Sequence, residues 1–176
     1  MSPKGAKEGG HNYALLLAGG QGSRFWPLSR ALAPKQVLSL NDAKSLFAQT
    51  IIRILPLIKP SNIFIATSHL YRRQVLQYAV DFKIPAGNII FETRGKNTAP
   101  SINAASQLIH SRDPHSRIAI LPCDHYIKNN TKFLQILSRA FYLCDDRNLI
   151  IFGLPAHRPA TGYGYIQAGR RSVAYG

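Results

Sequence analysis

The sequence predicts an α/β fold in which a mostly parallel β-sheet is flanked by helices. Short apolar runs that fit buried strands alternate along the chain with longer stretches whose apolar residues recur at helical spacing. This alternation is typical of parallel strands joined by helical crossovers, which cover both faces of the sheet. With 176 residues, of which 45% are hydrophobic, the chain is long enough to form one domain with its own core.

The expected elements follow one another in a regular order. Residues 1–11 are polar and rich in glycine and lysine, so we expect a disordered tail there and one domain over residues 12–176. Apolar runs predict strands at residues 13–18, 62–67, 88–92, 117–121 and 148–153. Helical spacing predicts helices at residues 45–55, 69–80, 97–110 and 131–144. The third helix should begin with Thr98 as its N-cap and Pro100 in its first turn.

The charge of the chain favours an anionic ligand. Lys and Arg number 22 against 8 Asp and Glu, which gives a formal net charge of +14. Nucleic acid or a membrane surface would suit such a charge as well. The basic residues are scattered, however, without a run of five and without an RNA-binding signature, so we do not expect nucleic acid as a partner.

Neither a membrane segment nor a disulfide framework is expected. No apolar run in the sequence reaches the length of a membrane span, and residues 1–12 lack the apolar stretch of a secretory signal. Cys123 and Cys144 are the two cysteines, which are too few for a disulfide framework or a zinc site. These features predict a cytoplasmic protein with reduced thiols and no membrane partner.

The segment after the first expected strand has the composition of a phosphate-binding loop. Glycines allow backbone N–H groups to approach an anion closely, and Arg and Lys side chains add full positive charges. An ordinary glycine-rich turn is the alternative, but the cations and prolines of the same segment argue against it. The candidate nucleotide-binding residues here are Leu17, Ala18, Gly19, Gly20, Gly22, Ser23, Arg24 and Lys35.

This loop matches neither of two common phosphate-binding motifs. The Walker A spacing is absent, because Lys35 lies far from the glycines and is followed by Gln36. The dinucleotide fingerprint is absent too, since Arg24 and Phe25 stand where its third glycine would arrive. The loop therefore predicts a phosphate site of another kind.

Two further polar segments begin where expected strands end. Residues 92–100 follow the third strand, and residues 121–125 follow the fourth. Ligands of open α/β sheets bind beyond the carboxyl ends of the strands, so these segments and the glycine loop should converge on one site. Asp124 would hold a divalent cation beside phosphates there, as carboxylates do in Mg²⁺ sites. Taken alone, an Asp that caps a turn is the simpler interpretation, and the loop upstream favours the metal.

Four motifs resemble those of the sugar-1-phosphate nucleotidyltransferase family. GGQGSRFWPLSRALAPKQ resembles its signature G-G-x-G-x-R-x-x-P-L-S-R-x-x-x-P-K-Q, in the form of the mannose-1-phosphate guanylyltransferase branch. ETRGKNTAP resembles E-P-x-x-R-N-T-A-P, and LPCDH resembles L-P-S-D-H. FGLPAHRPATGYGYI resembles F-G-I-x-P-T-x-P-E-T-G-Y-G-Y-I. The resemblance runs from about Tyr13 to Ile166 and implies a Rossmann-like nucleotidyltransferase fold.

The resemblance also implies a reaction and a role for each motif. GTP and mannose 1-phosphate would react to give GDP-mannose and pyrophosphate, by in-line attack on the α-phosphorus. Arg24 and Lys35 would be catalytic by neutralising phosphate charge, and Asp124 would bind Mg²⁺. The residues implied to lie against the base are Glu92, Asn97 and Thr98, and those against the sugar are Gly162, Tyr163 and Gly164.

Plainer interpretations exist for two of these segments. Asn97 and Thr98 would also fit the start of a helix, where a polar ligand can bind as well. The segment around Tyr163 would also fit a glycine-containing β-hairpin. The chain has Ala160 where the family has Glu, and Cys123 where it has Ser. The first departure concerns the sugar end of the site.

Family members continue beyond the T-G-Y-G-Y segment, so we interpret this chain as C-terminally truncated relative to them. The later part of the family carries a further sugar-contacting segment and a second metal-binding Asp. A homo-oligomer, or a partner chain that supplies the missing half, would complete the site. The alternatives to a guanylyltransferase are a catalytically impaired nucleotide-binding fragment, another sugar-1-phosphate specificity, and a basic nucleic-acid-binding protein.

Overall fold

The computed structural model describes residues 11–18, 45–92, 98–159, 161–167 and 169. Its strands are β1 (Asn12–Ala18), β2 (Ile63–Ser68), β3 (Ile89–Glu92) and β4 (Arg117–Pro122). Its α-helices are α1 (Leu46–Ile54), α2 (Arg72–Asp81), α3 (Ala99–Arg112) and α4 (Asn130–Leu143). Short 3₁₀ helices lie at Pro60–Asn62, His69–Tyr71 and Ala86–Asn88. These elements confirm the first four expected strands and the four expected helices, whereas the expected tail lies almost wholly outside the described residues.

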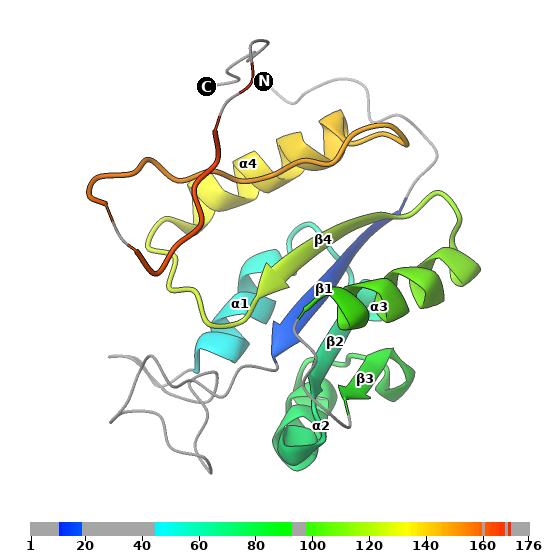
Figure 1. The fold of residues 1–176 in the computed structure, drawn as a ribbon. Helices are drawn as coiled ribbons and strands as arrows, with labels where there is room; N and C mark the ends of the chain where they lie inside the picture. Colours follow the sequence, from blue (N-terminus) through cyan, green and yellow to red (C-terminus); the bar gives the residue numbers. More distant parts are fainter. Residues whose placement is uncertain (1–10, 19–44, 93–97, 160, 168, 170–176) are drawn as a thin grey trace.

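The strands of the described sheet all run parallel, as the alternation of elements predicts. They lie in the order β3-β2-β1-β4 (Figure 1). The central strand is β1, in which Leu15 pairs with Phe64 of β2 on one side and with Ile120 of β4 on the other. Because helices cover both faces of such a sheet, strand residues of both faces are apolar. Ala14, Leu15 and Leu16 are accordingly all fully buried.

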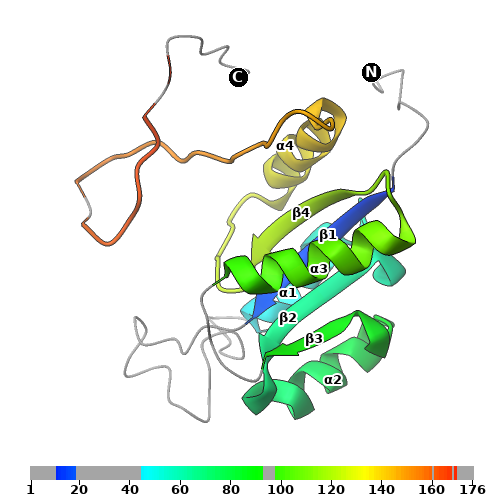
Figure 2. The same cartoon turned by 45° about the vertical axis from the view of Figure 1, so that its right-hand side comes forward.

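Successive side chains of β1 enter two hydrophobic cores, one on each face of the sheet. Ala14 and Leu16 belong to a core shared with α1, α2 and α4. Tyr13 and Leu15 belong to a second core shared with α3. Figure 2 shows α3 lying across the sheet on the face opposite α1. The two cores explain why the apolar run of β1 shows no alternation.

The order of the strands reverses between β1 and β4. The chain passes from β1 through β2 to β3 in one direction, with α1 and α2 on one face. It then returns past β1 to β4, with α3 on the other face. Right-handed crossovers require this change of face when the direction reverses. Helix α4 comes back to the first face, beside α1.

The expected fifth strand is not formed. Residues 148–153 are irregular chain that pairs with none of the described strands and runs alongside α4 (Figures 1 and 2). Leu149 is 97% exposed and Ile151 is 73% exposed. A strand needs the backbone of a neighbouring strand as well as an apolar pattern, and here only the pattern is present. That prediction was therefore wrong.

Two smaller expectations are also corrected. Residues 161–167 form turns and irregular chain, so the glycine-containing β-hairpin is not formed there. Thr98 occupies the N-cap position of α3, but its side chain caps no backbone N–H. Its own φ of −85° and ψ of −29° are already helical, whereas a capping residue has an extended backbone. Pro100 lies in the first turn of α3, as expected.

Among the described helices, none is long and apolar enough to cross a membrane.

A buried amide ties the sheet to α3. Asn88, which is 1% exposed, donates from Nδ2 to the carbonyl oxygens of Ser61 at 2.8 Å and Ile63 at 3.1 Å. Its Oδ1 accepts a hydrogen bond of 2.7 Å from Nη1 of Arg112. The guanidinium of Arg112 lies 5.1 Å from the centroid of the Phe64 ring. One side chain therefore joins the starts of β2 and β3 to the end of α3.

A contact between His11 and Asp113 lies where β1 and β4 begin. Nδ1 of His11 lies 2.8 Å from Oδ2 of Asp113, and the carbonyl oxygen of His11 accepts from the N–H of Arg117 at 3.1 Å. The N–H of His115 donates to Oδ1 of Asp113 at 3.0 Å. The hydrogen bond with His11 is the main reason that the pKa of the Asp113 carboxyl is lowered.

Replacing Asn88 by Ala should lower the free energy of unfolding by about 3 kcal/mol, because two carbonyl oxygens and a guanidinium lose a buried partner. Chemical denaturation measures this change. Asn103→Ala is the matched control, since Asn103 is exposed on α3 and bonds only Gln107 of the same helix. It should cost less than about 0.5 kcal/mol. Similar losses in both variants would contradict the role assigned to Asn88.

The ionised carboxyl of Asp113 should make the stability of the folded chain decrease at acidic pH. A carboxyl whose pKa falls on folding stabilises the folded chain above its unfolded pKa of about 4, and this contribution is lost as pH falls through the folded pKa. We expect Asp113→Asn to melt at a lower temperature than the unaltered chain near pH 6, and the difference to shrink toward pH 3. Melting temperatures across this range test the expectation, and a pH-independent difference contradicts it.

Candidate functional site

The reversal of strand order marks where a ligand would bind. In open α/β sheets, ligands occupy the crevice beyond the carboxyl ends of the strands at that point. Here the point lies between β1 and β4, whose arrowheads face the same side of the molecule in Figure 1. The expected phosphate loop begins directly after Ala18, and Asp124 comes two residues after Pro122. The two segments therefore leave the sheet from neighbouring strands.

Hydrogen bonds fix these two strand ends against each other. Leu17 pairs with Pro122, and the N–H of Cys123 donates to the carbonyl oxygen of Leu17 at 3.1 Å. On the other side of β1, Oγ1 of the fully buried Thr67 donates to the carbonyl oxygen of Ala18 at 3.1 Å. The structure thus brings the end of β1 and the loop that carries Asp124 together, as the sequence predicts.

Asp124 has the chemistry of a single cation ligand. Its side chain is 29% exposed, and its Oδ1 lies 3.7 Å from Nε2 of His125. Within the described part of the chain, no group of three or more His, Cys, Asp or Glu is placed to cage a metal. Mg²⁺ suits such a site, because it commonly takes one or two carboxylates and completes its coordination with phosphates and water. The hard carboxylate of Asp124 fits that cation, and its role as a ligand stays a prediction.

Cys123, the neighbour of Asp124, is a packing residue. It is fully buried, and burial raises the pKa of its thiol far above neutral pH. A protonated, inaccessible thiol is neither a metal ligand nor a nucleophile. The Cys that stands where the resembling motif has Ser therefore contributes to the core beneath the loop.

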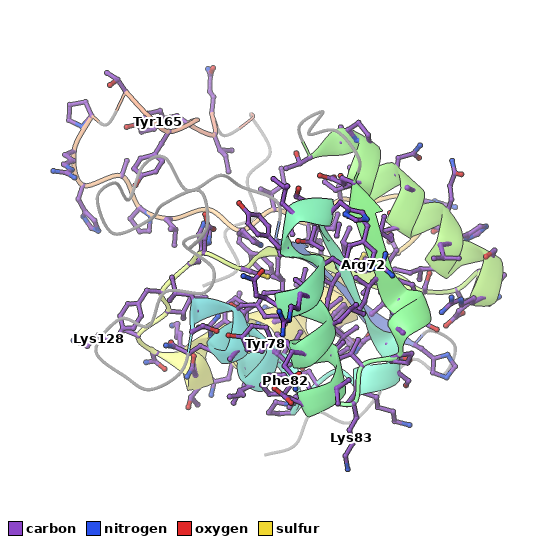
Figure 3. The ribbon with its side chains drawn as sticks, turned by 90° about the horizontal axis from the view of Figure 1, so that it is seen from below. Arg72, Tyr78, Phe82, Lys83, Lys128 and Tyr165 are labelled. Carbon is purple, nitrogen blue, oxygen red and sulfur yellow. The ribbon has the colours of Figure 1, made fainter. Side chains whose placement is uncertain are left out.

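Glu92 lies at the other end of the same sheet edge. It pairs with Ser68 of β2, and β2 and β1 separate it from β4. Three strand spacings of about 4.8 Å separate β3 from β4, so Glu92 and Asp124 are roughly 14 Å apart along the carboxyl edge of the sheet. One elongated ligand can therefore reach both. Arg72, labelled in Figure 3, adds a cation near this end, with its Cζ 4.9 Å from the centroid of the Phe91 ring.

The predicted sugar residues are not at this edge. Gly162, Tyr163 and Gly164 are exposed, Tyr163 to 71%, and their segment projects away from the sheet and its helices (Figures 1 and 2). Tyr165 lies in the same outlying segment in Figure 3 and donates to the carbonyl oxygen of Arg158 at 3.4 Å. A Cβ built on either glycine would meet nothing within 4 Å. No close approach therefore requires glycine in this conformation.

The remaining predicted residues divide into two groups. Thr98 is exposed at the start of α3, on the chain that follows β3. The others lie outside the described residues, and their roles stay predictions: Gly19, Gly20, Gly22, Ser23, Arg24, Lys35 and Asn97.

Thr67 is a residue that the sequence analysis missed. A signal was present, because the run NIFIAT ends in a hydroxyl residue at the point where a buried strand reaches the ligand edge. Thr67→Val keeps the side-chain shape and removes the donor to the carbonyl oxygen of Ala18, so it should lower the free energy of unfolding by about 1–2 kcal/mol. Ser68→Ala is the control, since its hydroxyl only accepts the N–H of Leu70 in an exposed turn. An equal or larger loss in the control would contradict the prediction.

Comparison with known proteins places this geometry in a family. The model of the nucleotidyl transferase family matches residues 13–174. The mannose-1-phosphate guanylyltransferase of Escherichia coli is 37% identical over 158 residues, which are 89% of this chain and 34% of that protein. The alginate biosynthesis protein AlgA of Pseudomonas aeruginosa is 36% identical over 162 residues, 88% of this chain and 32% of that protein. The chain thus spans about a third of the length of these curated relatives.

Solved structures agree with the fold. A mannose-1-phosphate geranyltransferase from Thermus thermophilus matches with a TM-score of 0.68 and 28% identity, over 77% of this chain and 38% of that one. The CTP:phosphocholine cytidylyltransferase of Streptococcus pneumoniae matches with a TM-score of 0.53 and 19% identity, over 69% of this chain and 48% of that one. They confirm the expected Rossmann-like nucleotidyltransferase fold. Since the family model covers nearly the whole described sheet and the helices around it, this chain belongs to the nucleotidyl transferase family.

Proposed function

We propose that this chain catalyses, or forms part of an enzyme that catalyses, guanylyl transfer from GTP to mannose 1-phosphate. The observation that carries the proposal is the position of Asp124 beside the end of β1, where the strand order reverses. A carboxylate there adjoins the start of residues 19–36, whose sequence suits phosphate binding. The choice of GTP and mannose 1-phosphate is supported by the relatives that carry the guanylyltransferase name.

The reaction requires positioning and charge neutralisation more than covalent chemistry. An oxygen of the sugar phosphate attacks the α-phosphorus of GTP in line. The bond between the α-phosphorus and the bridging oxygen breaks, and pyrophosphate leaves with that oxygen. Because the nucleophile is already an anion, no general base is needed. We assign to Arg24 and Lys35 the neutralisation of charge on the transferred and departing phosphates.

The other predicted residues have binding roles in this proposal. Asp124 would hold Mg²⁺, which supplies Lewis-acid neutralisation of phosphate charge when bound. The sugar residues must move to the carboxyl edge of the sheet to act, since their segment projects away from the sheet and its helices. The residues assigned to the nucleotide are Leu17, Ala18, Gly19, Gly20, Gly22, Ser23, Glu92, Asn97 and Thr98, and those assigned to the sugar are Gly162, Tyr163 and Gly164.

Nucleotide binding without catalysis is the second candidate function. The place of the sugar segment, away from the sheet edge, favours it. In this case a second copy or a partner chain would supply the sugar site.

Pyrophosphate release from GTP, mannose 1-phosphate and Mg²⁺ tests the proposal. Asp124→Ala should slow it on the order of 100-fold, because the phosphates lose a charge-neutralising group. Asp146→Ala removes an exposed carboxylate after α4 and should leave the rate unchanged. Release that needs both substrates and is slowed in Asp124→Ala, but not in Asp146→Ala, is the expected result.

The other outcomes separate the alternatives. GTP binding without pyrophosphate release would favour the second candidate, and the absence of both would contradict both candidates. Preference for GTP over ATP at equal salt identifies a nucleotide site. Equal binding of any polyanion, with a steep dependence on salt, would point instead to the nucleic-acid alternative.

A further inference from the structure

Arg53 is a buried cation to which the proposed chemistry gives no role. It lies in the last turn of α1 and is 5% exposed. Burial lowers the pKa of its guanidinium, because the charged form loses hydration. Taking a guanidinium out of water is unfavourable unless its donors find partners, so the partners indicate what the residue does.

The partners of Arg53 are neutral, and they connect α1 to the start of α4. Nε donates to Oδ1 of Asn130, the first residue of α4, at 2.7 Å. Nη1 lies 3.5 Å from Oγ1 of Thr50, whose hydroxyl donates to the carbonyl oxygen of Leu46 at 2.8 Å. The guanidinium also lies over the ring of Phe133, 5.7 Å from its centroid. These contacts hold the first turn of α4 against α1.

The loop between β4 and α4 is therefore anchored at both ends. At its start, the N–H of Cys123 bonds to Leu17 of β1, and the Cys123 side chain is fully buried. At its end, Asn130 bonds to Arg53. Asp124 lies between these two anchors, and the first of them is the bond to the strand that leads into the phosphate loop. Lys128, labelled in Figure 3, is an exposed residue of the same loop.

We propose that Arg53 is a positioning residue, which acts through Asn130 to hold the β4–α4 loop where Asp124 can bind a divalent cation. The inference rests on the cation role given to Asp124 in the proposed function. Arg53 itself touches no substrate in this role. Residues that hydrogen-bond directly to a metal ligand commonly change metal affinity by about 10- to 100-fold when they are lost, and Arg53, which acts through Asn130, should fall at the lower end of that range.

Whether the loss of Arg53 weakens or strengthens cation binding distinguishes a positioning role from a purely electrostatic one. Arg53 carries a positive charge near Cys123, the neighbour of Asp124, so electrostatics alone predicts that removing this charge would strengthen cation binding. Positioning predicts the opposite, because Asp124 loses its fixed place. Lys128→Met is the matched control, since it removes an exposed cation from the same loop without touching the anchor.

The experiment is a titration of the full chain with Mn²⁺ in the presence of GTP, whose phosphates complete the coordination, with protein-bound Mn²⁺ followed by water proton relaxation. Arg53→Met and Asn130→Ala should each weaken binding by about tenfold. The double variant should bind Mn²⁺ no more weakly than Arg53→Met alone, because both changes break the same hydrogen bond. Circular dichroism and melting temperature report whether each variant is folded. Asn130 is exposed, so its variant keeps the test valid where Arg53→Met fails to fold.

The outcomes separate this inference from the proposed function. Mn²⁺ binding that Asp124→Ala abolishes, and that Arg53→Met and Asn130→Ala leave unchanged, would overturn the positioning role alone. Tighter binding in Arg53→Met would overturn it as well, in favour of electrostatics. Absent Mn²⁺ binding, or binding that Asp124→Ala leaves unchanged, would remove the cation site on which both proposals rest.

Discussion

The parallel pairing of β1 with β4 is the constraint on which the rest of the structure depends. It makes β1 central, so that Leu15 and Leu16 enter cores on opposite faces of one sheet. It also continues one residue beyond the strands, through the bond from Cys123 to Leu17. Because parallel strands place their carboxyl ends at one edge, the chain after β1 and the chain after β4 must start side by side. The core and the candidate site thus have the same structural origin.

What could be predicted from the sequence was what a short stretch encodes by itself. The apolar runs of β1 to β4 and the helical spacing of α1 to α4 were sufficient to place those elements. The neighbouring positions of Ala18 and Asp124 then followed from the general rule for parallel sheets. The same reasoning failed for residues 148–153, because their apolar pattern resembles that of β4 but no described strand offers them a partner. The exposure of Leu149 shows the consequence.

The residues that sequence reasoning missed act across long separations. Thr67 bonds Ala18 across 49 positions, and Arg53 bonds Asn130 across 77. Nothing near these residues in the sequence names their partners. A weaker signal was nonetheless available in α1, where Arg53 falls on the face that buries Leu46 and Ile54. A charged residue on the apolar face of a helix indicates a specific polar partner, because its burial is otherwise unfavourable.

The burial of Arg53 is better explained by geometry than by stability. Replacing a buried ionic group by a well-packed apolar side chain is often neutral or stabilising, so an apolar residue between α1 and α4 would serve the core as well. An apolar contact is non-directional, however, whereas the bond of 2.7 Å from Nε to Asn130 fixes the position of the first residue of α4 relative to α1. The ring of Phe133 packs on the same guanidinium and helps to hold α4 in this position. Burying this cation costs free energy. That cost is consistent with a need to hold the β4–α4 loop, and Asp124 within it, at a fixed distance from the end of β1.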